Sequence, residues 1–137
     1  MGERFGDFVR RVRLAKKINL RKLAQLIDIV PAYMSDIENN RRYPPDLDKI
    51  KKIAQALELE PEEKNLLFDL AAWERENAAP PDLPEYIMSC ANARAALRMA
   101  RDMKADNNDW IKVIETLEKQ RLEKHQSAKK QTDDLGF

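Results

Sequence analysis

Basic side chains are concentrated in the N-terminal part of this 137-residue sequence. Residues 1–57 contain 13 Lys and Arg against 7 Asp and Glu, whereas residues 58–137 contain 12 Lys and Arg against 17 Asp and Glu. A surface with an excess of Lys and Arg attracts polyanions such as nucleic acids. The N-terminal part is therefore a candidate polyanion-binding face, and the open alternative is an ordinary solvated helical surface.

Residues that could support catalysis or hold a cofactor are few. The glycines stand at positions 2, 6 and 136, which excludes glycine-rich phosphate loops and the turn that presents a nucleophilic serine. One Cys and one His exclude a disulfide framework and a zinc site built only of Cys and His. No apolar run approaches the ~18 residues of a membrane span. We therefore expect no enzyme, no cofactor, no metal ion and no membrane partner, and we expect a cytoplasmic protein.

The elements that must position the cations are helices. Gly is rare, with 3 residues, so we expect few tight turns with positive φ and an all-α fold. Apolar residues recur at intervals of three and four, as on the buried face of a helix. This spacing predicts helices over residues 5–17, 20–27, 31–38, 46–57 and 62–76, and two amphipathic helices over about 83–103 and 107–124. The predicted domains are residues 1–77, a C-terminal helical region over 78–125 and a flexible tail over 126–137.

The second and third helices carry a spaced set of residues that resembles a known signature. The set is Leu23-Ala24-x-x-x-Asp28-Ile29-x-x-x-x-Met34-Ser35-x-x-Glu38-Asn39-Asn40. It resembles the Cro/C1-type (XRE) helix-turn-helix family over roughly residues 5–70. The resemblance implies a five-helix, lambda-repressor-like domain that binds double-stranded DNA. Asp28 and Asn40 stand where the family usually has Gly, and both types tolerate the left-handed conformation.

The resemblance also implies roles for individual residues. The third helix would enter the major groove, and its base-facing positions are Pro31, Ala32, Tyr33 and Asp36. None of these is Arg, Lys, Gln or Asn, so direct readout would be weak or would depend on Arg41 and Arg42 in the next loop. The predicted phosphate contacts are Asn19, Arg21, Lys22, Arg41, Arg42 and Tyr43, with a solvated loop as the alternative for the two loop arginines.

Two further roles concern stability and assembly. The family pairs an Arg of the first helix with the Glu that ends the third, which predicts a structural ion pair between Arg13 and Glu38. Relatives usually dimerise so that two recognition helices reach two half-sites. We expect the C-terminal helices to serve this purpose or to bind a partner, unless they form ordinary intrachain core. The candidate contact residues are Tyr86, Leu97, Trp110, Ile114 and Leu117.

The implied function is a sequence-specific, dimeric transcriptional regulator, most simply an autorepressor. One alternative is the antitoxin of a toxin–antitoxin pair, whose residues 83–122 would bind the toxin. The other is a protein-interaction module that keeps the fold and has lost DNA binding.

Overall fold

The computed structural model describes residues 2–76 and 78–134, and it describes side chains as far as residue 131. Within this part of the chain every regular element is an α-helix, which confirms the predicted all-α class. The helices are α1 (Phe5–Ala15), α2 (Leu20–Leu26), α3 (Pro31–Glu38), α4 (Leu47–Ala56), α5 (Pro61–Trp73), α6 (Pro84–Ser89), α7 (Ala91–Asp102) and α8 (Asn107–Asp134).

The chain divides into two compact units, with the division between Ser89 and Cys90. The first unit contains α1–α6 and the second contains α7 and α8. Sequence analysis placed the boundary after residue 77, in the stretch that ends in Pro80-Pro81. The structure differs because α6 groups with the first unit.

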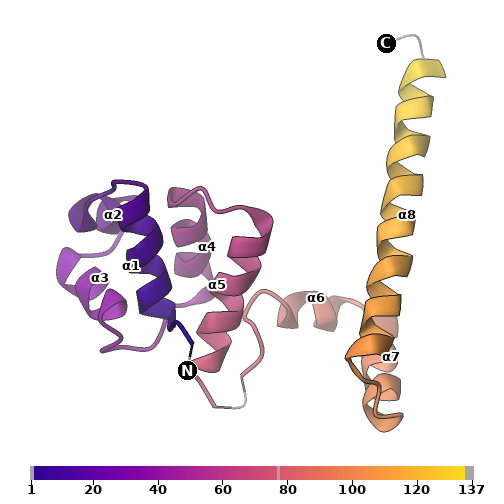
Figure 1. The fold of residues 1–137 in the computed structure, drawn as a ribbon, viewed down its shortest axis with the longest axis horizontal. Helices are drawn as coiled ribbons and strands as arrows, with labels where there is room; N and C mark the ends of the chain where they lie inside the picture. Colours follow the sequence, from indigo (N-terminus) through magenta and orange to yellow (C-terminus); the bar gives the residue numbers. More distant parts are fainter. Residues whose placement is uncertain (1, 77, 135–137) are drawn as a thin grey trace. The chain divides into compact units, whose positions relative to one another are not determined.

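Helices α1–α5 enclose one apolar core (Figure 1). Helix α3 packs against α1 and α2, and α5 packs against α1 and α4. The apolar faces predicted from the spacing are buried in α1, α2, α3 and α4. In α5 the apolar spacing predicts a buried face of Leu66, Leu67, Leu70 and Trp73. This prediction is partly wrong, since Leu66 and Trp73 are 39% and 74% exposed, whereas Phe68, outside the predicted face, is 2% exposed. The fully buried large side chains are Phe5, Phe8, Phe68, Leu23, Ile27, Met34, Ile37, Ile50, Ile53, Leu57, Leu67 and Val9.

The start of α1 touches the end of α3 at Gly6. A Cβ atom at Gly6 would collide with the carbonyl oxygen of Ile37 and would lie 2.8 Å from that of Glu38. The Gly6 amide donates to Asn40 Oδ1 at 3.0 Å, and Asn40 Nδ2 donates to Asp7 Oδ1 at 2.9 Å. Asn40 therefore links α1 to α3, and Gly6 provides the room for this contact.

Among the residues that the structure describes, five non-glycine residues adopt positive φ, which corrects the expectation that such turns are few. Asp28 and Asn40 do so as predicted, with φ of 61° and 57°. Lys17, Glu58 and Lys104 do so as well. Each of them follows a helix whose last carbonyls accept backbone hydrogen bonds from the turn, as in a Schellman motif.

The second unit differs from the sequence prediction in two places. The single helix expected over 83–103 is interrupted at Cys90, which has extended φ and ψ of −133° and 107°. Just before the break, Ser89 Oγ donates to the Tyr86 carbonyl oxygen at 2.6 Å and so competes with helix continuation. Helix α8 runs through residues 126–134, where a flexible tail was expected, and residues 135–137 lie outside the described residues. Within the described residues, none of the helices is long and apolar enough to cross a membrane.

A Gly6→Ala variant tests the close approach of α1 and α3. We expect the free energy of unfolding to fall by more than about 2 kcal/mol, because the colliding atoms belong to the backbone and cannot rotate away. Urea unfolding followed by circular dichroism measures this. Gly2→Ala is the matched control, since a Cβ at Gly2 meets nothing within 4 Å. Equal stability of the two variants would contradict the packing described here.

Glu58→Gly tests the cost of positive φ. Glu58 has φ of 51° after α4, and a β-carbon in this conformation costs roughly 1–2 kcal/mol. Since glycine also loses more backbone entropy on folding, we expect a net gain in stability of about 0.5–1 kcal/mol. Thermal unfolding measures it, with Glu62→Gly in the helical part of α5 as a control that should lose stability.

Candidate nucleic-acid interface

The N-terminus of α2 lies beside two cations, Arg21 and Lys22. Asn19 is the N-cap of α2, and its Oδ1 accepts a hydrogen bond from the Lys22 backbone N–H at 2.7 Å. The side chains of Arg21 and Lys22 are exposed. A helix N-terminus with adjacent cations favours an anion such as a phosphate.

The exposed side of α3 begins with apolar residues. Val30 is 65% exposed and gives the helix no side-chain cap, while Pro31 fills the first helical position. Pro31 and Ala32 are exposed, and Tyr33 is half-buried. These residues provide an apolar surface of the kind that contacts thymine methyl groups.

Arg42 folds back from the following loop onto this side of α3. Its guanidinium carbon lies 5.2 Å from the centre of the Tyr33 ring, and its Nε lies 3.4 Å from Asp36 Oδ2. Arg41 Nη1 lies 4.0 Å from the other carboxylate oxygen of Asp36. The two arginines offset the negative charge of Asp36, which would otherwise repel DNA.

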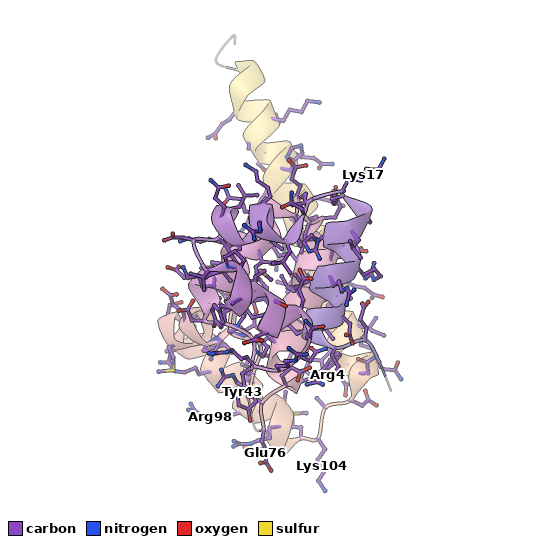
Figure 2. All side chains as sticks on the ribbon, turned by 90° about the vertical axis from the view of Figure 1, so that its left-hand side faces the viewer. Arg4, Lys17, Tyr43, Glu76, Arg98 and Lys104 are labelled. Carbon is purple, nitrogen blue, oxygen red and sulfur yellow. The ribbon has the colours of Figure 1, made fainter. Side chains whose placement is uncertain are left out.

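A second pair of arginines, which sequence analysis missed, lies next to this cluster. The Arg75 guanidinium carbon is 4.7 Å from the centre of the Tyr43 ring. Arg4 donates to both carboxylate oxygens of Glu74, at 3.1 and 2.8 Å. Arg4 and Tyr43 lie toward one end of the first unit and Lys17 toward the other (Figure 2). Arg4 and Arg75 come from outside the signature, and no periodicity in the sequence relates them to the loop after α3.

The Arg4–Glu74 contact holds the start of α1 against the end of α5. The hydrogen bonds from Arg4 hold the pKa of the Glu74 carboxyl below its usual range. The contact therefore contributes at neutral pH and is lost as the pH falls through that lowered pKa. Both partners reach solvent, so the contribution is small.

Several Lys and Arg side chains of the N-terminal part bond within the chain and are therefore less available to a polyanion. Lys49 Nζ donates to the carbonyl oxygens of Ile27 and Asp28 at 3.1 and 3.2 Å and thereby caps α2. Arg11 pairs with Glu3 at 2.8 Å. The charge excess of residues 1–57 thus overstates the number of cations available to a polyanion.

The predicted pairing of Arg13 with Glu38 is present in the structure. Arg13 Nε and Nη2 donate to the two carboxylate oxygens at 2.6 and 2.8 Å, and Nη1 donates to the Ile18 carbonyl oxygen at 2.9 Å. The residues are 7% and 3% exposed. The hydrogen bonds to Glu38 raise the pKa of Arg13 further above its usual value. This bidentate pair fixes the end of α3 on α1.

The predicted contact residues for assembly are all accessible to some degree. Tyr86 on α6 is 64% exposed, and Trp110 on α8 is half-buried. Leu97, Ile114 and Leu117 are 39%, 53% and 56% exposed. Among the described residues, no group of three or more His, Cys, Asp or Glu side chains could hold a metal ion.

A comparison with protein families identifies the arrangement of α2, the turn at Asp28 and α3. A helix-turn-helix family model matches residues 9–64, which include α2, α3 and the turn at Asp28. The chain belongs to the Cro/C1-type helix-turn-helix family. In helix-turn-helix terms α2 is the first helix of the motif and α3 is the recognition helix.

Three solved structures illustrate what this helix-turn-helix chain is similar to. The restriction-modification controller protein C.AhdI from Aeromonas hydrophila is 35% identical, with 44% of this chain and 89% of that chain covered and a TM-score of 0.40. The clp gene regulator ClgR from Corynebacterium glutamicum is 20% identical, with 75% and 92% covered and a TM-score of 0.44. The SinR protein/SinI protein complex is 16% identical, with 85% and 97% covered and a TM-score of 0.42. A comparison with curated proteins gives no match.

Variants of the buried ion pair test how the recognition helix is held. Glu38→Ala leaves the Arg13 guanidinium buried without its partner, so we expect a loss of about 3–5 kcal/mol in the free energy of unfolding. The double variant Arg13→Met/Glu38→Leu removes both charges, and it should be clearly more stable than Glu38→Ala. Urea unfolding of the single and double variants measures the coupling. Losses that simply add would show that the two residues act independently.

Proposed function

We propose that this helix-turn-helix chain is a sequence-specific, dimeric regulator of transcription that represses its own promoter. The family supports the DNA-binding regulator. The proposal further assigns the recognition surface to α3 together with the loop that follows it.

The observation that carries the proposal is the position of Arg42. The predicted base-facing residues of α3 offer no side chain that pairs with a guanine. Arg42 supplies one, because it rests on Tyr33 and Asp36 on the accessible side of the helix. Its side chain remains 61% exposed, so its remaining N–H groups are available to a ligand. An arginine reads guanine through two parallel hydrogen bonds to O6 and N7 in the major groove.

The proposal places phosphate contacts at the N-terminus of α2 and in the loop after α3. Arg21 and Lys22 would serve one phosphate at the N-terminus of α2, and Asn19 fixes that terminus. Arg41 would serve another, with a side chain that is 71% exposed. Tyr43 and Arg75 would extend the contact along the backbone, since their stacking leaves the tyrosine 62% exposed. Apolar contacts of Pro31 and Ala32 complete the surface.

Fluorescence anisotropy with the DNA upstream of the gene, against scrambled DNA, tests the proposal across a salt series. We expect selective binding whose affinity falls steeply with salt. Arg42→Ala should weaken binding to the operator by about 10-fold or more and leave binding to scrambled DNA nearly unchanged, because it removes a base contact. Arg41→Ala should weaken both equally and reduce the salt slope by about 1.

Lys64→Ala is the matched control. Lys64 lies in the first turns of α5, which packs mainly against α1 and α4. Its removal changes the net charge by the same amount as the arginine variants and should leave selectivity intact. No preference for upstream DNA over scrambled DNA would contradict autorepression. Binding to neither DNA would favour an interaction module that has lost DNA binding.

An antitoxin is the second candidate function, and the exposed apolar side chains of α7 and α8 favour it. In that case residues 83–122 would cover a toxin, and the helix-turn-helix domain would regulate the operon. Deletion of the gene distinguishes the candidates. An antitoxin gene is essential while its neighbour is expressed, whereas loss of an autorepressor only raises transcription from its promoter.

A further inference from the structure

The end of α5 places a cation beside the loop that follows the recognition helix. Arg75 comes directly after Glu74, the C-cap residue of α5, and its backbone N–H donates to the Ala72 carbonyl oxygen at 3.1 Å. Its guanidinium carbon lies 4.7 Å from the centre of the Tyr43 ring. A guanidinium is attracted to the face of an aromatic ring, so this contact keeps Arg75 close to the loop.

The residue before Arg75 is fixed by a distant part of the sequence. Glu74 is half-buried and accepts hydrogen bonds from Arg4 Nε and Nη2 at 3.1 and 2.8 Å, across 70 residues of sequence. Two parallel hydrogen bonds from one guanidinium fix orientation as well as distance. The contact therefore fixes the direction in which the chain leaves α5, and with it the place of Arg75.

The start of α1 is also bonded to the loop after α3. Arg4 is the N-cap of α1, and its backbone N–H donates to Asp7 Oδ2 at 3.1 Å. The other carboxylate oxygen of Asp7 accepts from Asn40 Nδ2 at 2.9 Å. Arg4, Glu74 and residues 40–43 line one cavity of about 290 Å³. The loop after α3 and the end of α5 thus have a common support.

The arginines at this end of the first unit have the form of a phosphate site. Arg42 and Arg75 line a second cavity of about 380 Å³ together with Tyr33 and Tyr43. Each guanidinium lies over one of the two rings. Stacking leaves N–H groups at the edge of a guanidinium available to a phosphate. The acid of this cavity, Asp46, accepts the Lys49 backbone N–H as the cap of α4.

We propose that Arg4 is a positioning residue for DNA, which acts through Glu74 to hold Arg75 where it binds a phosphate. The start of α1 then sets how far the DNA contact extends beyond the loop after α3. The inference deepens the proposed function, since it rests on DNA binding. Arg4 and Arg75 both lie outside residues 9–64, which the helix-turn-helix family model matches.

Glu74→Met distinguishes positioning from simple charge. The variant removes a negative charge beside the DNA surface and releases Arg4, so electrostatics alone predicts tighter DNA binding. Positioning predicts weaker binding and a salt slope reduced by about 1, because the phosphate contact of Arg75 is lost. Arg75→Ala should reduce the slope equally, and the two changes together should cause no further reduction. Fluorescence anisotropy of the full-length chain over a salt series measures this.

The double variant Arg4→Met/Glu74→Met leaves the net charge unchanged and should lower the slope as Glu74→Met does. Glu62→Met is the matched control, because it removes the same charge from the first turn of α5 and should not lower the slope. The exposed Arg4–Glu74 contact contributes little to stability, so these variants should fold, which circular dichroism checks.

A measurement without DNA keeps the two proposals apart. Nuclear Overhauser contacts between Arg75 and the Tyr43 ring should weaken in Glu74→Met. Undiminished contacts, tighter DNA binding by Glu74→Met, or an unchanged salt slope in the double variant would each overturn the inference. An unchanged protein that binds no DNA counts against the proposed function instead.

Discussion

The recognition helix depends on one constraint, the attachment of its C-terminal end to α1. Two contacts make the attachment. The buried pair of Arg13 and Glu38 holds the last turn of α3, and the Asn40 side chain holds the residues that follow it by bonding to Gly6 and Asp7. Buried charges keep a single geometry because any displacement leaves them without partners. The loop with Arg41 and Arg42 begins at this fixed point. The orientation of α3 and the placement of its loop cations therefore follow from the packing of α1.

The same constraint explains why α1 needs a glycine at position 6, whereas the turns with positive φ form without glycine. At Gly6 a side chain would meet backbone atoms, so no other residue fits. At Lys17, Glu58 and Lys104 the side chains are exposed, and positive φ costs only the local conformational energy of roughly 1–2 kcal/mol. Hydrogen bonds that close the preceding helix offset part of this cost. A count of glycines therefore underestimates the number of such turns, because tertiary packing can impose the conformation on Lys or Glu.

Helical spacing was sufficient to predict α1–α4, since each of these helices buries a single apolar face in one core. The spacing gave wrong predictions in two places, at the end of α5 and at the break between α6 and α7. Trp73 continues the apolar stripe of α5 yet is exposed, and the apolar spacing passes through Cys90 although the helix stops there. The family signature predicted the Arg13–Glu38 pair because both residues belong to the motif. The stacking of Arg42 on Tyr33 and of Arg75 on Tyr43 could not be predicted, since it depends on how a loop turns and on which helix end lies nearby.

The two units differ in how much apolar surface they bury, and this difference is relevant to how a DNA-binding helix with few base contacts could still be selective. The first unit buries all the core residues, and the second buries none among its described side chains. In the proposed function, one recognition helix that presents Pro31, Ala32 and a single arginine would contribute few base contacts. Two such helices joined in a dimer make binding of the second half-site effectively intramolecular, so the dimer binds far more tightly than either half. If the helices of the second unit form only when they pair, dimerisation and DNA binding stabilise each other by linkage. In the proposed dimer, operator occupancy would then depend steeply on protein concentration, which is the response that an autorepressor requires.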